Sequence, residues 1–106
     1  TVEPLDICVI LGNLLDNAIE ACTRISDQEA RFLRVYLGTH QGQLYISVTN
    51  SAPALRRKGR QYLSTKIQGD HGFGLLRIDR IAAKYGGVVN RQSEEGVFAT
   101  EILLPI

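Results

Sequence analysis

"GDHGFGLLRIDRIAAKYGG", residues 69–87, sets five glycines around an amphipathic helical pattern. Apolar residues recur between the glycines at helical spacing, which predicts a helix over about residues 73–85. Gly86 and Gly87 predict the end of this helix, because glycine adopts the left-handed conformation that closes many helices. The remaining three glycines lie at the beginning of the helix. Glycine loses more conformational freedom on folding than other residues, so three of them here indicate a functional requirement.

Gly69, Gly72 and Gly74 give the spacing G-x-x-G-x-G before this helix. A backbone without Cβ atoms lets N–H groups approach an anion closely. The first turn of a helix adds unpaired N–H donors and the positive end of the helix dipole, which stabilises a nearby negative charge by ~0.3–1 kcal/mol. The pattern predicts a phosphate-binding helix start, and the alternative is a flexible turn that ends a loop.

A second helix is predicted over residues 5–24, "LDICVILGNLLDNAIEACTR", and it is apolar around most of its circumference. At ~100° per residue, five polar side chains fall within about 40° of one line. They are Asp6, Asn13, Asn17, Glu20 and Arg24. We interpret this polar stripe as facing a binding site.

Asn13 and Asn17, at positions i and i+4, bring two carboxamide oxygens together on that stripe. Neutral oxygens suit Mg²⁺ when the bound ligand already carries negative charge, because Mg²⁺ takes part of its coordination from phosphates and water. The alternative is that these amides bond to neighbouring backbone or face solvent.

Two hairpins complete the predicted fold. Residues 31–38 and 43–50 alternate apolar and polar side chains, so we expect one face of this hairpin, including Leu33, Val35 and Leu37, to lie against a core. A second hairpin follows the helix of residues 73–85. Two helices over an antiparallel sheet give the α+β class, a two-layer sandwich, here a single domain over residues 1–106.

Size and composition describe an ordinary soluble domain. The 106 residues suffice for one core, and a net charge of +1 does not favour nucleic acid or an anionic membrane as a partner. The sequence contains no apolar run of the ~20 residues that span a bilayer and no leader pattern. We therefore expect a cytoplasmic chain or the cytoplasmic part of a larger protein.

Cysteine and histidine show no pattern of a disulfide or of a protein-held metal site. Cys8 and Cys22 lie ~20 Å apart along the predicted helix, so we expect two buried free thiols. His40 and His71 have no partners at metal-ligand spacing.

The stretch "SAPALRRKGRQYLSTKIQG", residues 51–69, has little periodicity and holds five of the twelve Lys and Arg residues. A loop this long in a small domain is usually functional or disordered. Its cations, with the hydroxyls of Ser64 and Thr65, could fold over a triphosphate. The alternative is a solvated basic loop.

Three motifs in this order resemble the GHKL superfamily of gyrase-type topoisomerases, Hsp-type chaperones, sensor histidine kinases and mismatch-repair ATPases. "LGNLLDNAIEA" resembles its N-box, "HGFGLLRIDRIAAKYGG" its second glycine box and "GVFATEILLPI" its closing strand. The chain is most similar to the ATP-binding catalytic domain of peptide-pheromone, or quorum-sensing, sensor histidine kinases. The resemblance covers nearly the whole chain and implies the Bergerat fold, with helices over a mixed, mostly antiparallel sheet.

The resemblance also implies the site residues and two cofactors, ATP and Mg²⁺. Asn13 and Asn17 become the Mg²⁺ ligands and catalytic residues, and residues 51–70 the ATP lid, in which Lys66 is the catalytic cation. Asn50 takes the adenine-contacting position. The segment around the phosphates comprises Gly69, His71, Gly72, Phe73, Gly74 and Leu75.

Two departures from the family pattern bear on function. Asn13 stands where the hydrolysing branches have a glutamate, and a carboxamide cannot take a proton from water near neutral pH, which favours phosphoryl transfer to a protein side chain. The role of Glu20, on the same stripe, stays open. In "NSAPA", residues 50–54, Asn50 replaces the usual aspartate and Ala52 and Ala54 replace glycines, so we expect weaker or slower ATP binding.

The implied parent protein supplies the missing parts. His40 and His71 do not resemble a phosphoacceptor, so the acceptor histidine is expected on a dimerisation domain of the same parent, a homodimeric, membrane-bound bacterial sensor that passes the phosphoryl group to a response regulator. No nucleic acid and no direct membrane contact are expected. Two alternatives stay open: a GHKL ATPase, and a nucleotide-binding or inactive module that acts through partner contacts.

Overall fold

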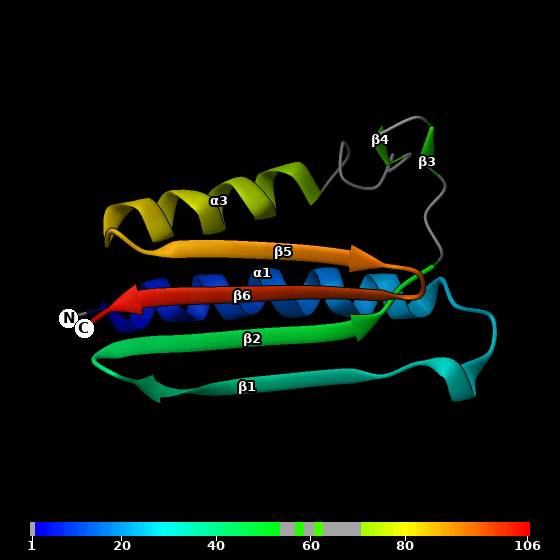
Figure 1. Ribbon diagram of the computed structural model, residues 1–106, viewed down its shortest axis with the longest axis horizontal. Helices are drawn as coiled ribbons and strands as arrows, with labels where there is room; N and C mark the ends of the chain where they lie inside the picture. The colour runs from blue at the N-terminus through cyan, green and yellow to red at the C-terminus, as the bar shows by residue number, and fades with distance from the viewer. Residues whose placement is uncertain (1, 54–56, 59–60, 63–70) are drawn as a thin grey trace.

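The computed structural model describes residues 2–53, 57–58, 61–62 and 71–106. Two long helices lie on one face of a four-stranded sheet, and a short two-stranded hairpin lies near the beginning of the second of these helices (Figure 1). In chain order the elements are α1 (Pro4–Thr23), the 3-10 turn η1 (Gln28–Ala30), β1 (Leu33–His40), β2 (Gln43–Ser51), β3 (Arg57–Lys58), β4 (Gln61–Tyr62), α3 (His71–Lys84), β5 (Val88–Glu94) and β6 (Val97–Pro105).

The main sheet has the strand order β1-β2-β6-β5, and all three neighbouring pairs are antiparallel. The two sequence hairpins, β1-β2 and β5-β6, are therefore joined side by side through β2 and β6. The helix-over-sheet α+β class is confirmed. The expected mixed sheet is not seen, because every pairing among the described strands is antiparallel.

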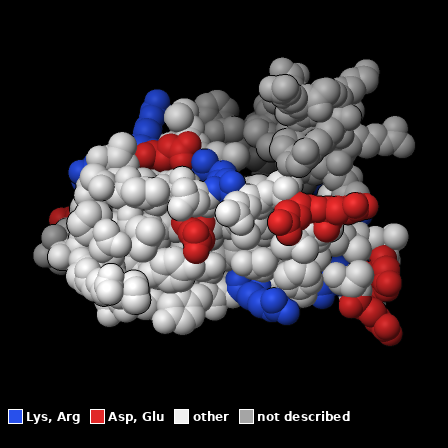
Figure 2. Space-filling view, viewed as in Figure 1, with Lys and Arg blue, Asp and Glu red and all other residues white. Residues whose placement is uncertain are grey.

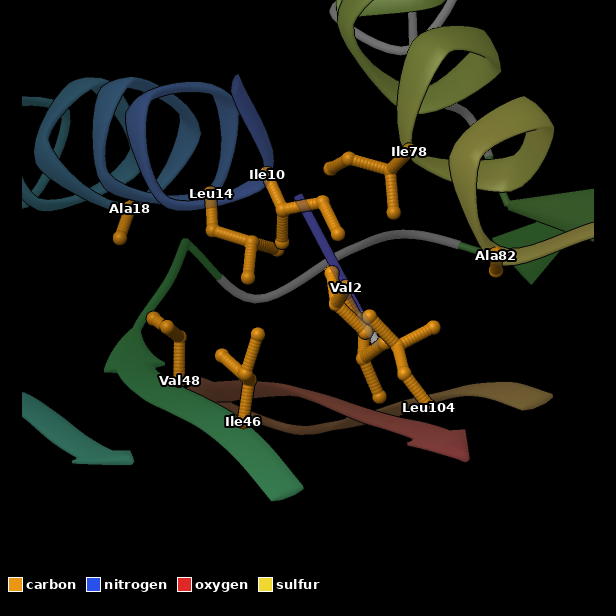
Figure 3. Packing of buried hydrophobic residues seen from close by; sticks show 10 residues of the cluster. Val2, Ile10, Leu14, Ala18, Ile46, Val48, Ile78, Ala82 and Leu104 are labelled. Carbon is orange, nitrogen blue, oxygen red and sulfur yellow. The ribbon is translucent and has the colours of Figure 1, made fainter. Parts of the chain in front are cut away.

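The core lies between the helices and the central strands. Figure 3 shows Ile10 and Leu14 of α1 directed toward Ile46 and Val48 of β2, with Ile78 directed inward from α3. The largest completely buried apolar side chains come from both layers and are Ile10, Ile46, Ile78, Ile102 and Leu104. Burial of these side chains on one face of each element supplies the main stabilisation of the fold.

The expectation that β1 lies against this core is wrong. Leu33, Val35 and Leu37 are 40%, 49% and 50% exposed. The physical reason is the order of the strands: β1 is the outer strand of the sheet, and α1 packs mainly on β2, so the sheet extends beyond the helix layer (Figure 1). The alternation in β1 correctly predicted which side chains share the helix-facing side of the sheet, but it did not predict that the helices leave them exposed.

The face of the sheet that carries no helix is mostly uncharged. Figure 2 shows uncharged side chains over much of this face, with charges of both signs around them. Tyr36 and Tyr45 lie on it with ring centroids 5.6 Å apart, and the Tyr45 hydroxyl donates to Glu101 Oε2 at 2.6 Å. The hydrogen bond to Glu101 raises the pKa of Tyr45 above its ordinary value.

The cysteines differ from expectation as well. Both are free thiols, as expected, but Cys8 is exposed and Cys22 only half-buried. Cys8 lies on the side of α1 away from the sheet core, because α1 buries one face rather than most of its circumference. Within the described residues, the structure has no helix long and apolar enough to cross a membrane.

A polar cluster joins the beginning of α1 to the end of α3. Lys84 Nζ donates to Asp6 Oδ2 at 2.9 Å, the Tyr85 hydroxyl donates to the same oxygen, and the Glu3 N–H donates to the Tyr85 hydroxyl at 3.1 Å. The hydrogen bonds from Tyr85 and then from Lys84 lower the pKa of Asp6, and the bond to Asp6 raises the pKa of Lys84. This cluster fixes the two helices relative to each other at one end of the molecule.

The Asp6→Asn variant should lose part of the acid sensitivity of the wild type. The pKa of Asp6 is lowered from 3.8 in the folded chain, so the unfolded chain binds this proton more readily. The stability that the carboxylate contributes is thus present above about pH 4 and is lost as the pH falls through the lower folded-state pKa. Thermal melting from about pH 2 to pH 7 measures this difference. Asp16→Asn, at an exposed position of the same helix, is the control, and equal acid profiles for wild type and Asp6→Asn would contradict the assignment.

A second prediction concerns the turn after α3. A Cβ on Gly87 would lie against the Leu103 carbonyl oxygen and 2.6 Å from Leu104 Cδ2, so Gly87→Ala should lower the free energy of unfolding by about 1–3 kcal/mol. Gly12→Ala is the matched control, since a Cβ at that helical position meets nothing within 4 Å. It should be neutral or stabilising by up to ~1 kcal/mol. Urea unfolding measures both changes, and equal midpoints would refute the close packing at Gly87.

Candidate functional site

Helix α3 begins earlier than predicted. It starts at His71 rather than residue 73, so Gly72, Phe73 and Gly74 belong to its first turn and not to a loop before it. Glycine is tolerated there because first-turn N–H groups have no partner inside a helix. Gly69 and Lys66, two predicted site residues, lie outside the described residues.

Asn13 of α1 faces the first turn of α3. A Cβ built on Gly74 would lie 3.0 Å from Asn13 Oδ1, which is tighter than ordinary contact. The missing side chain at Gly74 therefore leaves the space that the Asn13 carboxamide uses. The structure thus brings together the polar stripe and the glycine motif, which lie about sixty residues apart in the sequence.

The orientation of the Asn13 carboxamide is fixed from within α1. Its Nδ2 donates to the Val9 carbonyl at 2.8 Å, so the alternative of a local backbone bond is partly correct. That bond uses the amide nitrogen and leaves Oδ1 on the side of Gly74. Asn17 is half-buried one helical turn further along the same stripe, as the spacing predicts.

Asn50 is a second oriented carboxamide. It lies near the end of β2, on the side of the sheet that faces the helices, and is 2% exposed. Its Nδ2 donates to the Ser51 carbonyl at 2.8 Å. The reverse orientation of the amide would set two carbonyl oxygens against each other, so the nitrogen end is used by Ser51 and Oδ1 is the other end of the carboxamide.

The basic segment begins later than expected. Ser51 is the last residue of β2, and Ala52 is 5% exposed, with its N–H donating to the Gly96 carbonyl at 2.9 Å. Both residues were predicted to belong to a loop over residues 51–70, but Ser51 belongs to β2 and a main-chain hydrogen bond ties Ala52 to the turn between β5 and β6. Strands β3 and β4 form a short hairpin in that segment, which the weak periodicity did not predict. Ala54 lies outside the described residues.

Three polar residues near Asn50 were not predicted. Ser51 and Thr100 are each 2% exposed, and Cys22 contacts Ser51. The alternation of β6 could have identified Thr100 from the sequence. Thr100 occupies an inward position between Phe98 and Ile102, where the pattern predicts an apolar side chain. Cys22 and Ser51 carry no comparable local signal, because only the tertiary structure brings them together.

A shallow cavity of about 300 Å³ lies on the other flank of α1. Its lining residues are Ile19, Cys22, Thr23, Arg31, Phe32 and Leu33. This cavity contains none of the predicted site residues. Among the described residues, His, Cys, Asp and Glu form no group of three that could hold a metal ion.

The donor set fits a magnesium–nucleotide complex. Mg²⁺ prefers oxygen ligands and shares them with phosphates and water, and Asn13 offers a neutral oxygen beside the positive end of α3. Asn50 offers a buried acceptor oxygen, which suits an amino group rather than a second acceptor. The arrangement can therefore bind an anion and its metal near Gly74 and an amino-bearing ring near Asn50.

Comparison with known proteins identifies the family of this chain. The family described as "GHKL domain" matches residues 2–105. Two curated relatives, a probable C4-dicarboxylate sensor kinase of Halalkalibacterium halodurans and the sensor histidine kinase DpiB of Escherichia coli, are each 31% identical over 94% and 89% of this chain. The chain spans only 20% and 18% of those relatives.

A solved structure shows the same fold. The catalytic domain of histidine kinase ThkA superposes with a TM-score of 0.73 at 22% identity, over 98% of this chain and 69% of that one. At this identity the similarity concerns the arrangement of helices and strands.

Gly74→Ala should displace the Asn13 side chain while leaving the fold intact, because the clashing atom is the end of a movable side chain. In ¹⁵N–¹H spectra we expect the Asn13 side-chain amide signals to shift strongly. The Ile19→Ala variant, at an exposed position further along α1, should leave these signals in place. Unchanged Asn13 signals in Gly74→Ala would show that the two residues are not in contact.

Proposed function

We propose that this chain, which belongs to the GHKL domain family, is the ATP-binding catalytic domain of a two-component sensor histidine kinase. Such a domain transfers the γ-phosphoryl group of ATP to a histidine on a separate dimerisation domain. The observation that carries the proposal is the approach of Asn13 Oδ1 to Gly74, which brings the candidate metal ligand to the candidate phosphate site. The sensor-kinase relatives, matched along most of this chain, support the same activity.

We assign Mg²⁺ to the carboxamide oxygens of Asn13 and Asn17. When bound, Mg²⁺ would neutralise charge on the phosphates and help to align the γ-phosphoryl group. The chain's own contribution is orientation: Val9 holds the Asn13 amide, and the spacing of one turn places Asn17 on the same side of α1. Neutral ligands avoid adding negative charge next to a polyphosphate.

We assign adenine to Asn50. The Asn50 Oδ1 would accept a hydrogen bond from the 6-amino group, while Ser51 retains one amide hydrogen of Asn50. The second amide hydrogen can donate to a ring nitrogen, as in the adenine contacts of asparagine in DNA recognition. An asparagine held in this way serves as the acceptor that the aspartate of related sequences would provide.

The phosphates would lie at the beginning of α3. Gly69, His71, Gly72, Phe73, Gly74 and Leu75 are the proposed contacts. Backbone N–H groups of the first helical turn and the positive helix end would stabilise the anion. We further propose that the segment predicted as residues 51–70 acts as the ATP lid. Because Ser51 belongs to β2, this lid would begin after Ser51. Within it, Lys66 would approach the transferring phosphoryl group.

Transfer is favoured over hydrolysis because Asn13 cannot act as a base toward water. The acceptor is then a histidine outside this chain, and the partners we propose are a dimerisation domain of the same parent, a response regulator, and a second parent subunit in a homodimer. The domain would act in the cytoplasm, where ATP is available, as part of a membrane-bound sensor. The peptide-pheromone subtype is proposed on the motif "NAIEA" and on the Ser/Thr-rich segment with Lys66 before "HGFGL", since the curated relatives carry other sensor names.

A second candidate is a nucleotide-binding or inactive module that acts through partner contacts. It is favoured by Ala52, which replaces a family glycine and is buried at 5% exposure beside the proposed adenine position. Calorimetric titration of the domain with Mg²⁺ and a non-hydrolysable ATP analogue separates the two candidates. We expect binding with a dissociation constant below about 1 mM, corresponding to ~4 kcal/mol. The absence of heat at millimolar ligand would favour the module.

Asn17→Ala should reduce phosphoryl transfer to an added dimerisation domain by about 100-fold or more, since it removes a proposed metal ligand. Asp16→Ala, an exposed neighbour on another side of α1, is the control and should retain wild-type transfer. Radiolabel transfer from ATP measures both rates. Full activity of Asn17→Ala would disprove the metal assignment, and steady phosphate release by the domain alone would indicate an ATPase.

A further inference from the structure

Cys22 connects three elements at one end of the fold. It belongs to the last turn of α1, and its Sγ lies 3.3 Å from the Phe32 carbonyl, just before β1. The same sulfur lies 3.4 Å from Ser51 Oγ and 3.8 Å from the Ser51 carbonyl oxygen at the end of β2. Cys22 is about 140° around the helix from Asn17, so it does not belong to the polar stripe.

Ser51 is the residue that these contacts hold. Its N–H donates to the Phe32 carbonyl at 3.0 Å, and its Oγ accepts from the Phe32 N–H at 2.9 Å. The Ser51 hydroxyl can in turn donate to the Phe32 carbonyl at 3.3 Å. Together with the Cys22 thiol these bonds leave the Ser51 peptide little freedom to rotate.

The Ser51 carbonyl is also the group that orients Asn50. It accepts from Asn50 Nδ2 at 2.8 Å, and this bond fixes which end of the carboxamide is the nitrogen and which the oxygen. The path from Cys22 through the Ser51 carbonyl to Asn50 therefore consists of direct contacts. All three residues are at least half-buried, so water competes weakly for these groups.

We propose that Cys22 and Ser51 are positioning residues that set the base specificity of the nucleotide site. Cys22 packs against the Ser51 hydroxyl and carbonyl, the carbonyl accepts from the Asn50 amide, and the Asn50 oxygen is thereby presented as a hydrogen-bond acceptor. This inference depends on the proposed function, because it assumes that the site binds a purine nucleotide.

An acceptor at Asn50 distinguishes purines by the group at ring position 6. Adenine has an amino group there and can donate to the Asn50 oxygen, whereas hypoxanthine has a carbonyl oxygen that repels it. Loosening the Ser51 carbonyl lets the carboxamide turn, and a turned carboxamide would donate to hypoxanthine instead. The loss of Cys22 should therefore change the choice of base rather than the binding of phosphates.

The experiment compares Mg²⁺·ATP, Mg²⁺·ITP and Mg²⁺·tripolyphosphate binding by calorimetry, with the domain alone. We expect the wild type to prefer ATP to ITP by about 10-fold or more, as a site with a directed hydrogen bond does. Cys22→Ala should reduce that preference about 3- to 10-fold. Tripolyphosphate, which has no base, should bind both proteins equally.

Two further variants separate positioning from general damage. Cys22→Ser keeps a donor at the same place and should restore most of the preference for ATP. Cys8→Ala removes the exposed thiol of the same helix and should change nothing. In ¹⁵N–¹H spectra of the unliganded domain, the Asn50 side-chain amide signals should move in Cys22→Ala and return toward wild type in Cys22→Ser.

The possible failures are distinguishable. If the wild type binds tripolyphosphate but not ATP, or binds neither, the proposed nucleotide function fails and this inference fails with it. If ATP binds but Cys22→Ala retains the wild-type ratio of ATP to ITP affinity, the positioning role alone is refuted. Equal losses for ATP, ITP and tripolyphosphate in Cys22→Ala would also refute it, because they would indicate a general disturbance of the domain.

Discussion

Two asparagine side chains, each tied by its amide nitrogen to a main-chain carbonyl, are the constraint on which the candidate site depends. Asn13 donates to Val9 within α1, and Asn50 donates to Ser51 at the end of β2, both at 2.8 Å. A free carboxamide can present either its donor or its acceptor end. These two cannot turn without breaking a hydrogen bond, so each presents an oxygen. The site is thereby suited to a cation near α3 and to an amino group near β2.

Packing of the two helices brings the Asn13 oxygen into position. Asn13 approaches α3 at Gly74, where a side chain would occupy the same space, and the cluster of Asp6, Lys84 and Tyr85 holds the opposite ends of the helices together. The buried side chains between them, such as Ile10 and Ile78, fix the distance of both helices from the sheet. The chemistry of the site is therefore inseparable from the close contact of α1 with α3.

The carboxamide at Asn13 limits what this side chain can do. It cannot take a proton from water near neutral pH, so Asn13 itself can contribute binding, orientation and charge neutralisation. The proposed transfer reaction requires a histidine acceptor on another part of the parent protein, and this chain spans about a fifth of the length of its curated relatives.

Local sequence patterns determined the two helices, the two hairpins and the residue types of the site, because helical and strand periodicity and glycine placement act within a few residues. The spacing of Asn13 and Asn17 and the glycines of α3 could be read directly. Only the tertiary structure decided that β1 lies at the edge with its apolar face exposed, that Ser51 belongs to the sheet, and that Cys22 contacts Ser51. Strand order and the position of a helix over a sheet result from contacts between residues far apart in the sequence, and no local pattern encodes them.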